Sequence, residues 1–217
     1  MKINELILFT NNLDKQIDFY SIILGFQILN STPESCSFKV GDSILIFKYR
    51  KDVVPYHFAI NIPSNKEIEA LNWLKERVAV LSFDGNEIID FSNWNAKAIY
   101  FYDIDKNIVE FISRKNLNLN SSLKFSTKLS INISEIGIVT DNIEETYDSL
   151  IKINKISVFS GDFDRFCAVG DDQGLFIIVN NKFKKWFPTG DLIEQSDFSI
   201  KGDFNFKYTN GKIIEVS

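Results

Sequence analysis

The sequence is poor in histidine and cysteine, the residues that most often mark transition-metal or thiol chemistry. Its 217 residues include a single histidine, His57, and two cysteines, Cys36 and Cys167. The cysteines lie far apart without CxxC spacing, so we expect reduced, buried thiols, as is usual in the cytoplasm. A metal site built from several histidines or cysteines is therefore excluded, and the one histidine stands out.

An excess of positive charge and long apolar runs are also missing. The chain has 24 Lys and Arg against 29 Asp and Glu, a net charge of -5. Because these charges are interspersed, no basic stripe could neutralise phosphates. No apolar run approaches the roughly 18 residues of a membrane span, and the N-terminus lacks a signal-peptide pattern. We expect a cytoplasmic protein that binds a small molecule, with neither nucleic acid nor membrane as partner.

Short strands alternate with helices in an order that repeats along the chain. Residues 3–50 show the pattern of a strand, a helix and three strands (βαβββ), and residues 56–113 show it again. Residues 115–130 shift to Asn, Ser, Lys and Thr, which predicts a connector. A third unit begins at Ile131, because ISEIGIVTDNI matches INELILFTNNL near the N-terminus almost position for position. A turn around Asn210 indicates a C-terminal hairpin.

These repeats predict an α+β protein with curved mixed sheets. We expect two and a half to three βαβββ units plus the C-terminal hairpin. In this interpretation residues 1–114 form one domain from the first two units, and residues 115–130 are a linker. Residues 131–217 then contain the third unit and a truncated fourth.

Two motifs resemble those of a known family. Residues 19–26 (FYSIILGF) resemble the first-helix signature of the vicinal oxygen chelate superfamily. Residues 94–97 (WNAK), followed by residues 103–110 (DIDKNIVE), resemble its closing hairpin. This superfamily includes glyoxalase I, fosfomycin- and bleomycin-resistance proteins and extradiol dioxygenases. It usually has proline at Ile104 and glycine at Lys106, departures that affect the turn but leave the strand register intact.

In that family two units pair into a cup whose floor holds a divalent metal. Carried over position by position, the resemblance implies metal ligands at Glu5, His57 and Glu110. Glu5 departs from the more frequent histidine, and Ile46, at a fourth position that some members use, cannot coordinate. The implied cofactor is a divalent ion such as Zn, Mn, Fe, Ni or Mg. Glu110 or Glu5, if displaced from the metal, could act as the catalytic general base.

The chemistry of these residues supports the same site. Glu110 lies between Val109 and Phe111, where an unpaired carboxylate would be costly unless it were protonated or bound to a cation. One imidazole and two carboxylates form a nitrogen and oxygen ligand set suited to divalent ions. The alternative is that His57 is a hydrogen-bonded core residue and Glu5 a solvated strand residue.

The third unit offers no second triad. Glu135 occupies the position that corresponds to Glu5, but Ile177 stands where Glu110 would be, and this unit has no histidine. We therefore expect no metal site of this pattern there.

Aromatic residues are abundant, with 20 Phe, 7 Tyr and 3 Trp. Most must fill the cores of the curved sheets. Tyr100, Tyr102 and Trp94 are candidates to line the cup and bind a planar or apolar substrate.

The sequence alone is consistent with several functions. One is a metal-dependent enzyme, an isomerase, lyase, transferase or dioxygenase, acting on a small oxygen-rich or aromatic molecule. Another is a non-catalytic binding or resistance protein that needs no metal, and a third is a structural or regulatory relic. Because such units pair either within a chain or between chains, a homodimer is also open.

Overall fold

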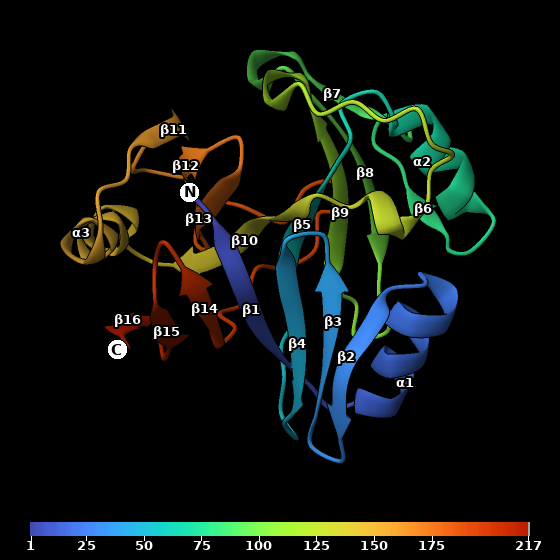
Figure 1. Ribbon diagram of the computed structural model, residues 1–217. Coiled ribbons are helices and arrows are strands. Elements are labelled where there is room, and N and C mark those ends of the chain that lie inside the picture. The colour runs from blue at the N-terminus through green and yellow to red at the C-terminus, as the bar shows by residue number, and fades with distance from the viewer. Residues whose placement is uncertain (217) are drawn as a thin grey trace.

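The computed structural model describes residues 1–216 and contains three βαβββ-like units, the second with one additional short strand, followed by three more strands (Figure 1). The first unit comprises β1 (Ile3–Thr10), α1 (Leu13–Asp18), β2 (Gln27–Thr32), β3 (Ser35–Val40) and β4 (Ser43–Tyr49). The second comprises β5 (His57–Ile62), α2 (Glu67–Lys75), β6 (Val80–Leu81), β7 (Ile89–Phe91), β8 (Ala96–Tyr102) and β9 (Ile108–Arg114). The third comprises β10 (Asn132–Thr140), α3 (Ile143–Ile153), β11 (Val158–Gly161), β12 (Phe166–Asp171) and β13 (Gly174–Asn180). The last strands are β14 (Phe198–Gly202), β15 (Phe206–Thr209) and β16 (Lys212–Glu215).

The α+β class and the βαβββ repeat predicted from the sequence are confirmed. The C-terminal hairpin is also present, with Thr209 of β15 opposite Lys212 of β16. It is preceded by β14, which the sequence pattern does not separate from the surrounding coil. Ser217, the last residue of the expected third segment, lies outside the described residues.

The strands form two curved halves of one continuous sheet. The first half runs β16-β15-β14-β1-β4-β3-β2, and the second runs β11-β12-β13-β10-β5-β9-β8, with β6 and β7 both pairing with β8. The halves join where β1 meets β10, with Ile3 opposite Ile133. The second unit therefore pairs with the third, and the first pairs with the C-terminal strands. The expected pairing of the first unit with the second is not formed, because β5 has β9 and β10 as its neighbours.

Each half of the sheet has a helix-covered face and a concave face. Side chains alternate across a strand, so Phe58 and Ile60 of β5 pack into the larger core together with helix residues such as Leu74 and Leu150. Ala59, between them, belongs to the second buried cluster on the concave face. None of the helices in the described part of the chain is long and apolar enough to cross a membrane.

Residues 115–130, the connector, pack against the first and second units. Phe125 is buried, and its backbone N–H donates to Glu69 of α2 over 3.0 Å. The Thr127 hydroxyl donates to the carbonyl of Leu24 over 2.6 Å. These contacts fix the connector against the first and second units and lead the chain to the start of β10 beside β5 (Figure 1).

Candidate metal centre

Three strands of the second half place a histidine and two glutamates on one concave face. β5 pairs in parallel with β9, which sets Ala59 opposite Glu110. β5 also pairs antiparallel with β10, which sets Ala59 opposite Glu135. His57 lies two residues before Ala59 and shares its face. Because the alanine between the two glutamates is only a methyl group, one ligand atom from each of His57, Glu110 and Glu135 lies within 4.8 Å of the others.

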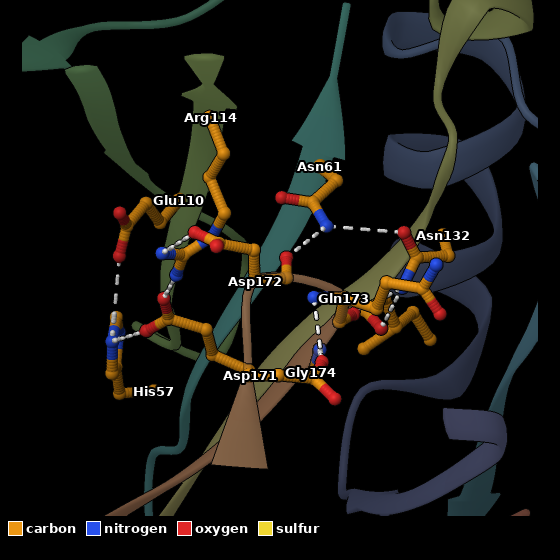
Figure 2. Close-up of polar contacts among 11 residues, drawn as sticks. His57, Asn61, Glu110, Arg114, Asn132, Asp171, Asp172, Gln173 and Gly174 are labelled. Carbon is orange, nitrogen blue, oxygen red and sulfur yellow. Dashed lines mark hydrogen bonds and ion pairs between the residues drawn. The ribbon is translucent and has the colours of Figure 1, made fainter. Parts of the chain in front are cut away.

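The three side chains are buried, and the imidazole is oriented by the backbone. His57 Nε2 lies 3.6 Å from an oxygen of Glu110 and 3.9 Å from an oxygen of Glu135; Figure 2 shows the histidine turned toward Glu110. His57 Nδ1 lies 3.2 Å from the carbonyl of Ile108. A carbonyl can only accept, so Nδ1 carries a proton and Nε2 is the ring nitrogen that faces the carboxylates. A metal ligand requires this orientation, with Nε2 free to bind the ion.

The electrostatics of the site favour a bound cation. Burial raises the pKa of Glu110 well above its ordinary value, and the nearby Glu135 carboxylate raises it further, while Arg114 and the Tyr100 hydroxyl act in the opposite direction. Burial and the Glu110 carboxylate also raise the pKa of Tyr100. Two carboxylates held close together repel each other, and a divalent ion between them would relieve both the repulsion and the burial cost. The donor set therefore fits a divalent metal.

A cavity of about 550 Å³ opens above these residues. Its wall is rich in aromatic side chains: Phe91, Trp94, Tyr100, Phe166, Trp186 and Phe187. Lys184 and Lys185 also line it, and the Lys184 ammonium lies 3.9 Å from the centre of the Phe166 ring. Trp186 covers the floor, with its ring centre 5.3 Å from that of His57.

Two of the three residues predicted to contact a substrate line this cavity. Tyr100 and Trp94 line the cavity. Tyr102 is not among the lining residues; its hydroxyl donates to Asp191 in the segment between β13 and β14. Whether these side chains contact a ligand stays a prediction.

Glu5 lies elsewhere, which corrects the expected ligand set. It belongs to β1 in the first half of the sheet, and its carboxylate pairs with Lys201 of β14 over 2.8 Å. The expectation that Glu5 joins His57 and Glu110 is wrong, because the opening strand beside β5 is β10 and not β1. Glu135 of β10 takes that place, so the third unit, which was expected to hold no triad of its own, supplies one residue to the cluster that it shares with the second unit.

The signal for Glu135 was present in the repeat. ISEIGIVT and INELILFT place Glu135 and Glu5 at equivalent positions, so the sequence marks both as first-strand candidates. The local sequence does not show which of the two opening strands, β1 or β10, pairs with β5. Ile177 of β13 also lines the cavity and cannot coordinate, so the cluster found among the described residues consists of the three ligands His57, Glu110 and Glu135.

Paired βαβββ units with a buried histidine and two glutamates on their concave face define a glyoxalase-like fold with a candidate metal site. The model of the Glyoxalase/Bleomycin resistance protein/Dioxygenase superfamily matches residues 2–156. The chain belongs to this superfamily.

Curated relatives resemble part of the chain. A protein from Staphylococcus haemolyticus (strain JCSC1435) named metallothiol transferase FosB is 33% identical over 116 residues, which cover 50% of this chain and 80% of the relative. A protein of the same name from Staphylococcus epidermidis is 32% identical over 116 residues, with the same coverage.

Solved structures share the fold over a longer stretch. A protein from Bacillus subtilis subsp. subtilis str. 168, provisionally named a dioxygenase, aligns with a TM-score of 0.62 and 15% identity over 82% of this chain and 63% of that one. The present chain thus spans less than two thirds of that protein. A mutant of glyoxalase I from Zea mays aligns with a TM-score of 0.55 and 14% identity over 82% of this chain and 67% of that one. At these identities the likeness shows the fold alone.

Proposed function

We propose that this protein is a divalent-metal-dependent enzyme that acts on a small molecule in the cavity above His57, Glu110 and Glu135. The observation that carries the proposal is the convergence of one nitrogen and two carboxylate oxygens, all buried and within 4.8 Å of one another. The names of the curated relatives support a metal and make thiol transfer the first reaction to test.

The protein side chains have separable roles in this proposal. His57, Glu110 and Glu135 would hold the metal, which when bound would act as a Lewis acid on an oxygen of the substrate. The aromatic wall would exclude water, and Lys184 and Lys185 would favour an oxygen-rich or anionic molecule. Glu110, if displaced from the metal, stays our candidate for a general base. Glu5 has no support for that role, because it does not line this cavity.

The metal content of the purified protein tests the proposal. The protein would be prepared without chelators or a histidine tag, reconstituted separately with Zn, Mn, Fe, Ni and Mg, desalted and analysed by mass spectrometry. We expect one metal ion per chain in the wild type and a loss of more than tenfold in affinity for His57→Ala and Glu135→Gln, because the first removes one of three ligands and the second replaces a charged ligand by a neutral amide.

Glu5→Gln is the matched control. It removes a carboxylate at the equivalent position of the repeat but outside the cavity, so its metal content should equal that of the wild type. A folded wild type that binds none of the five ions would contradict the proposal, and so would full metal retention in His57→Ala.

A second candidate is a non-catalytic protein that binds an aromatic small molecule without metal. The contact between Arg114 and Glu135 favours it, because it gives one of the two carboxylates a cation from the protein itself. Thermal-shift screening of aromatic compounds in EDTA separates the two: a binding protein gains stability from a ligand in EDTA, whereas the enzyme gains it when metal is added.

A further inference from the structure

Arg114 is a charged side chain that lies beneath the candidate metal site and is completely buried. It is the last residue of β9, four residues after Glu110, and its side chain is 0% exposed. It does not line the cavity, so a ligand in the cavity would not touch it. Figure 2 shows it extending from β9 toward the turn that carries Asp172.

The hydrogen bonds of this guanidinium are incomplete. Nη2 donates to one oxygen of Glu135. Nη1 lies 3.7 Å from Asp172, and within residues 1–216 neither Nη1 nor Nε has a hydrogen-bond partner. The Trp94 ring centre lies 5.7 Å from the guanidinium carbon. A buried arginine with one close partner is costly, so the Glu135 carboxylate is its main compensation.

Glu135 is shared between this arginine and the candidate metal site. Its Oε1 bonds to Arg114, and its Oε2 faces His57 Nε2 at 3.9 Å. A metal held by the triad would therefore bind a carboxylate whose charge is already balanced. Two carboxylates alone would neutralise a divalent ion. Arg114 adds one positive charge to that site, which Asp172, 3.7 Å from Nη1, offsets from the side away from Glu135.

We propose that Arg114 is a built-in counter-ion that compensates Glu135 in the metal-free protein and weakens metal binding by offsetting the negative charge of that carboxylate. This inference rests on the proposed function. Arg114 would stabilise the metal-free protein, and it would lower the metal affinity below that of the same triad without an arginine.

Titration of Mn²⁺ into metal-free wild type and Arg114→Met tests this counter-ion role at pH 7. Methionine fills much of the arginine's volume and removes its charge, so Glu135 becomes a buried unpaired carboxylate. We expect a lower Tm for the metal-free variant, a dissociation constant for Mn²⁺ at least tenfold lower than in the wild type, and a larger rise in Tm on adding Mn²⁺. Arg114→Lys keeps the positive charge and should bind Mn²⁺ within about threefold of the wild type.

A purely structural role would give a different result. If Arg114 only filled space, Arg114→Met, which keeps most of that volume, would change the Tm of the metal-free protein little, and its Mn²⁺ affinity would be unchanged or weaker; an affinity that does not rise overturns the inference. If the wild type binds Mn²⁺ and the variant gains no affinity, the inference alone fails. If the variant binds and the wild type does not, the inference holds and the proposed metal-dependent function of the natural protein fails. If neither binds, both fail.

A double variant tests the counter-ion role even if Arg114→Met does not fold. Glu135→Gln combined with Arg114→Met removes both buried charges at once. Its metal-free form should recover most of the Tm that Arg114→Met loses. A double variant as unstable as the single one, or equally unable to fold, would show that Arg114 acts through packing and would overturn the counter-ion role.

Discussion

Asp103 shows how one residue connects the two sequence motifs that resemble the family. It lies in the turn between β8 and β9, is 5% exposed, and accepts hydrogen bonds from the side chains of Gln16 (3.0 Å), Tyr20 (2.9 Å) and Asn107 (2.8 Å). The backbone N–H groups of Asp105 and Asn107 also donate to it, each over 3.0 Å. Burial raises the pKa of Asp103 to about 6, and the three side-chain donors oppose that rise. The carboxylate therefore ties the first helix to the closing hairpin of the second unit.

Asp103→Asn should destabilise the protein by about 3 kcal/mol. The carboxylate accepts hydrogen bonds at both oxygens, whereas an amide has one oxygen and would direct its N–H group toward donors. Urea denaturation at pH 7.5 measures the free energy of unfolding. Asp148→Asn, on the exposed side of α3, is the control and should change it by less than about 0.5 kcal/mol. Equal stability of the two variants would mean that this network contributes little.

At the scale of elements, the segment between β13 and β14 closes the concave face of the second half. Its Trp186 is 7% exposed and lies over His57. Gly137 of β10 makes room for it, since a Cβ at that position would lie 2.5 Å from the Trp186 ring. Asp191 accepts from the Tyr102 hydroxyl, which connects the far end of the segment to β8.

Gly137→Ala should therefore displace Trp186 from His57 and expose it. The expected result is stronger acrylamide quenching of tryptophan fluorescence, because the added methyl group overlaps the ring and β10 is fixed by its neighbours. Trp186→Phe, with and without Gly137→Ala, is the control: once Trp186 is absent, the glycine substitution should leave quenching of Trp73 and Trp94 unchanged. Unaltered quenching in Gly137→Ala alone would mean that the backbone adapts and the ring stays.

The same segment marks the limit of what the sequence predicted. The units were predictable because β1 and β10 share an alternating pattern and because Gly25 and the hairpin motifs are local features. Residues 181–197 have no periodicity, so nothing in the sequence places Trp186 over His57. His57 and Glu110 come together because their strands belong to one unit, whereas Glu135 depends on pairing between units. Whether β5 pairs with β1 or with β10 depends on contacts between residues that are far apart in the sequence.

At the scale of the whole molecule, the candidate site spans the connector. His57 and Glu110 precede residues 115–130 and Glu135 follows them. The C-terminal strands lie in the other half, where β14 pairs with β1, β15 with β14 and β16 with β15, and they contribute nothing to the triad. A bound metal would act as a cross-link within the second half alone.

Hydrogen exchange of metal-free protein with and without Mn²⁺ should therefore reveal a local effect. A ligand at 100 times its dissociation constant stabilises the state that binds it by about 2.7 kcal/mol. Amides of β5, β9 and β10 should exchange up to about a hundredfold more slowly. Amides of β14 to β16 should change less, because their half shares the Ile3 and Ile133 pair with the second half of the sheet and otherwise contacts it largely through side chains, such as the Tyr208 hydroxyl that donates to the carbonyl of Val139. His57→Ala should show a difference at least tenfold smaller on adding the same concentration of Mn²⁺. Equal protection of β14 to β16 and β5 would contradict this division and would indicate that the two halves unfold as one cooperative unit.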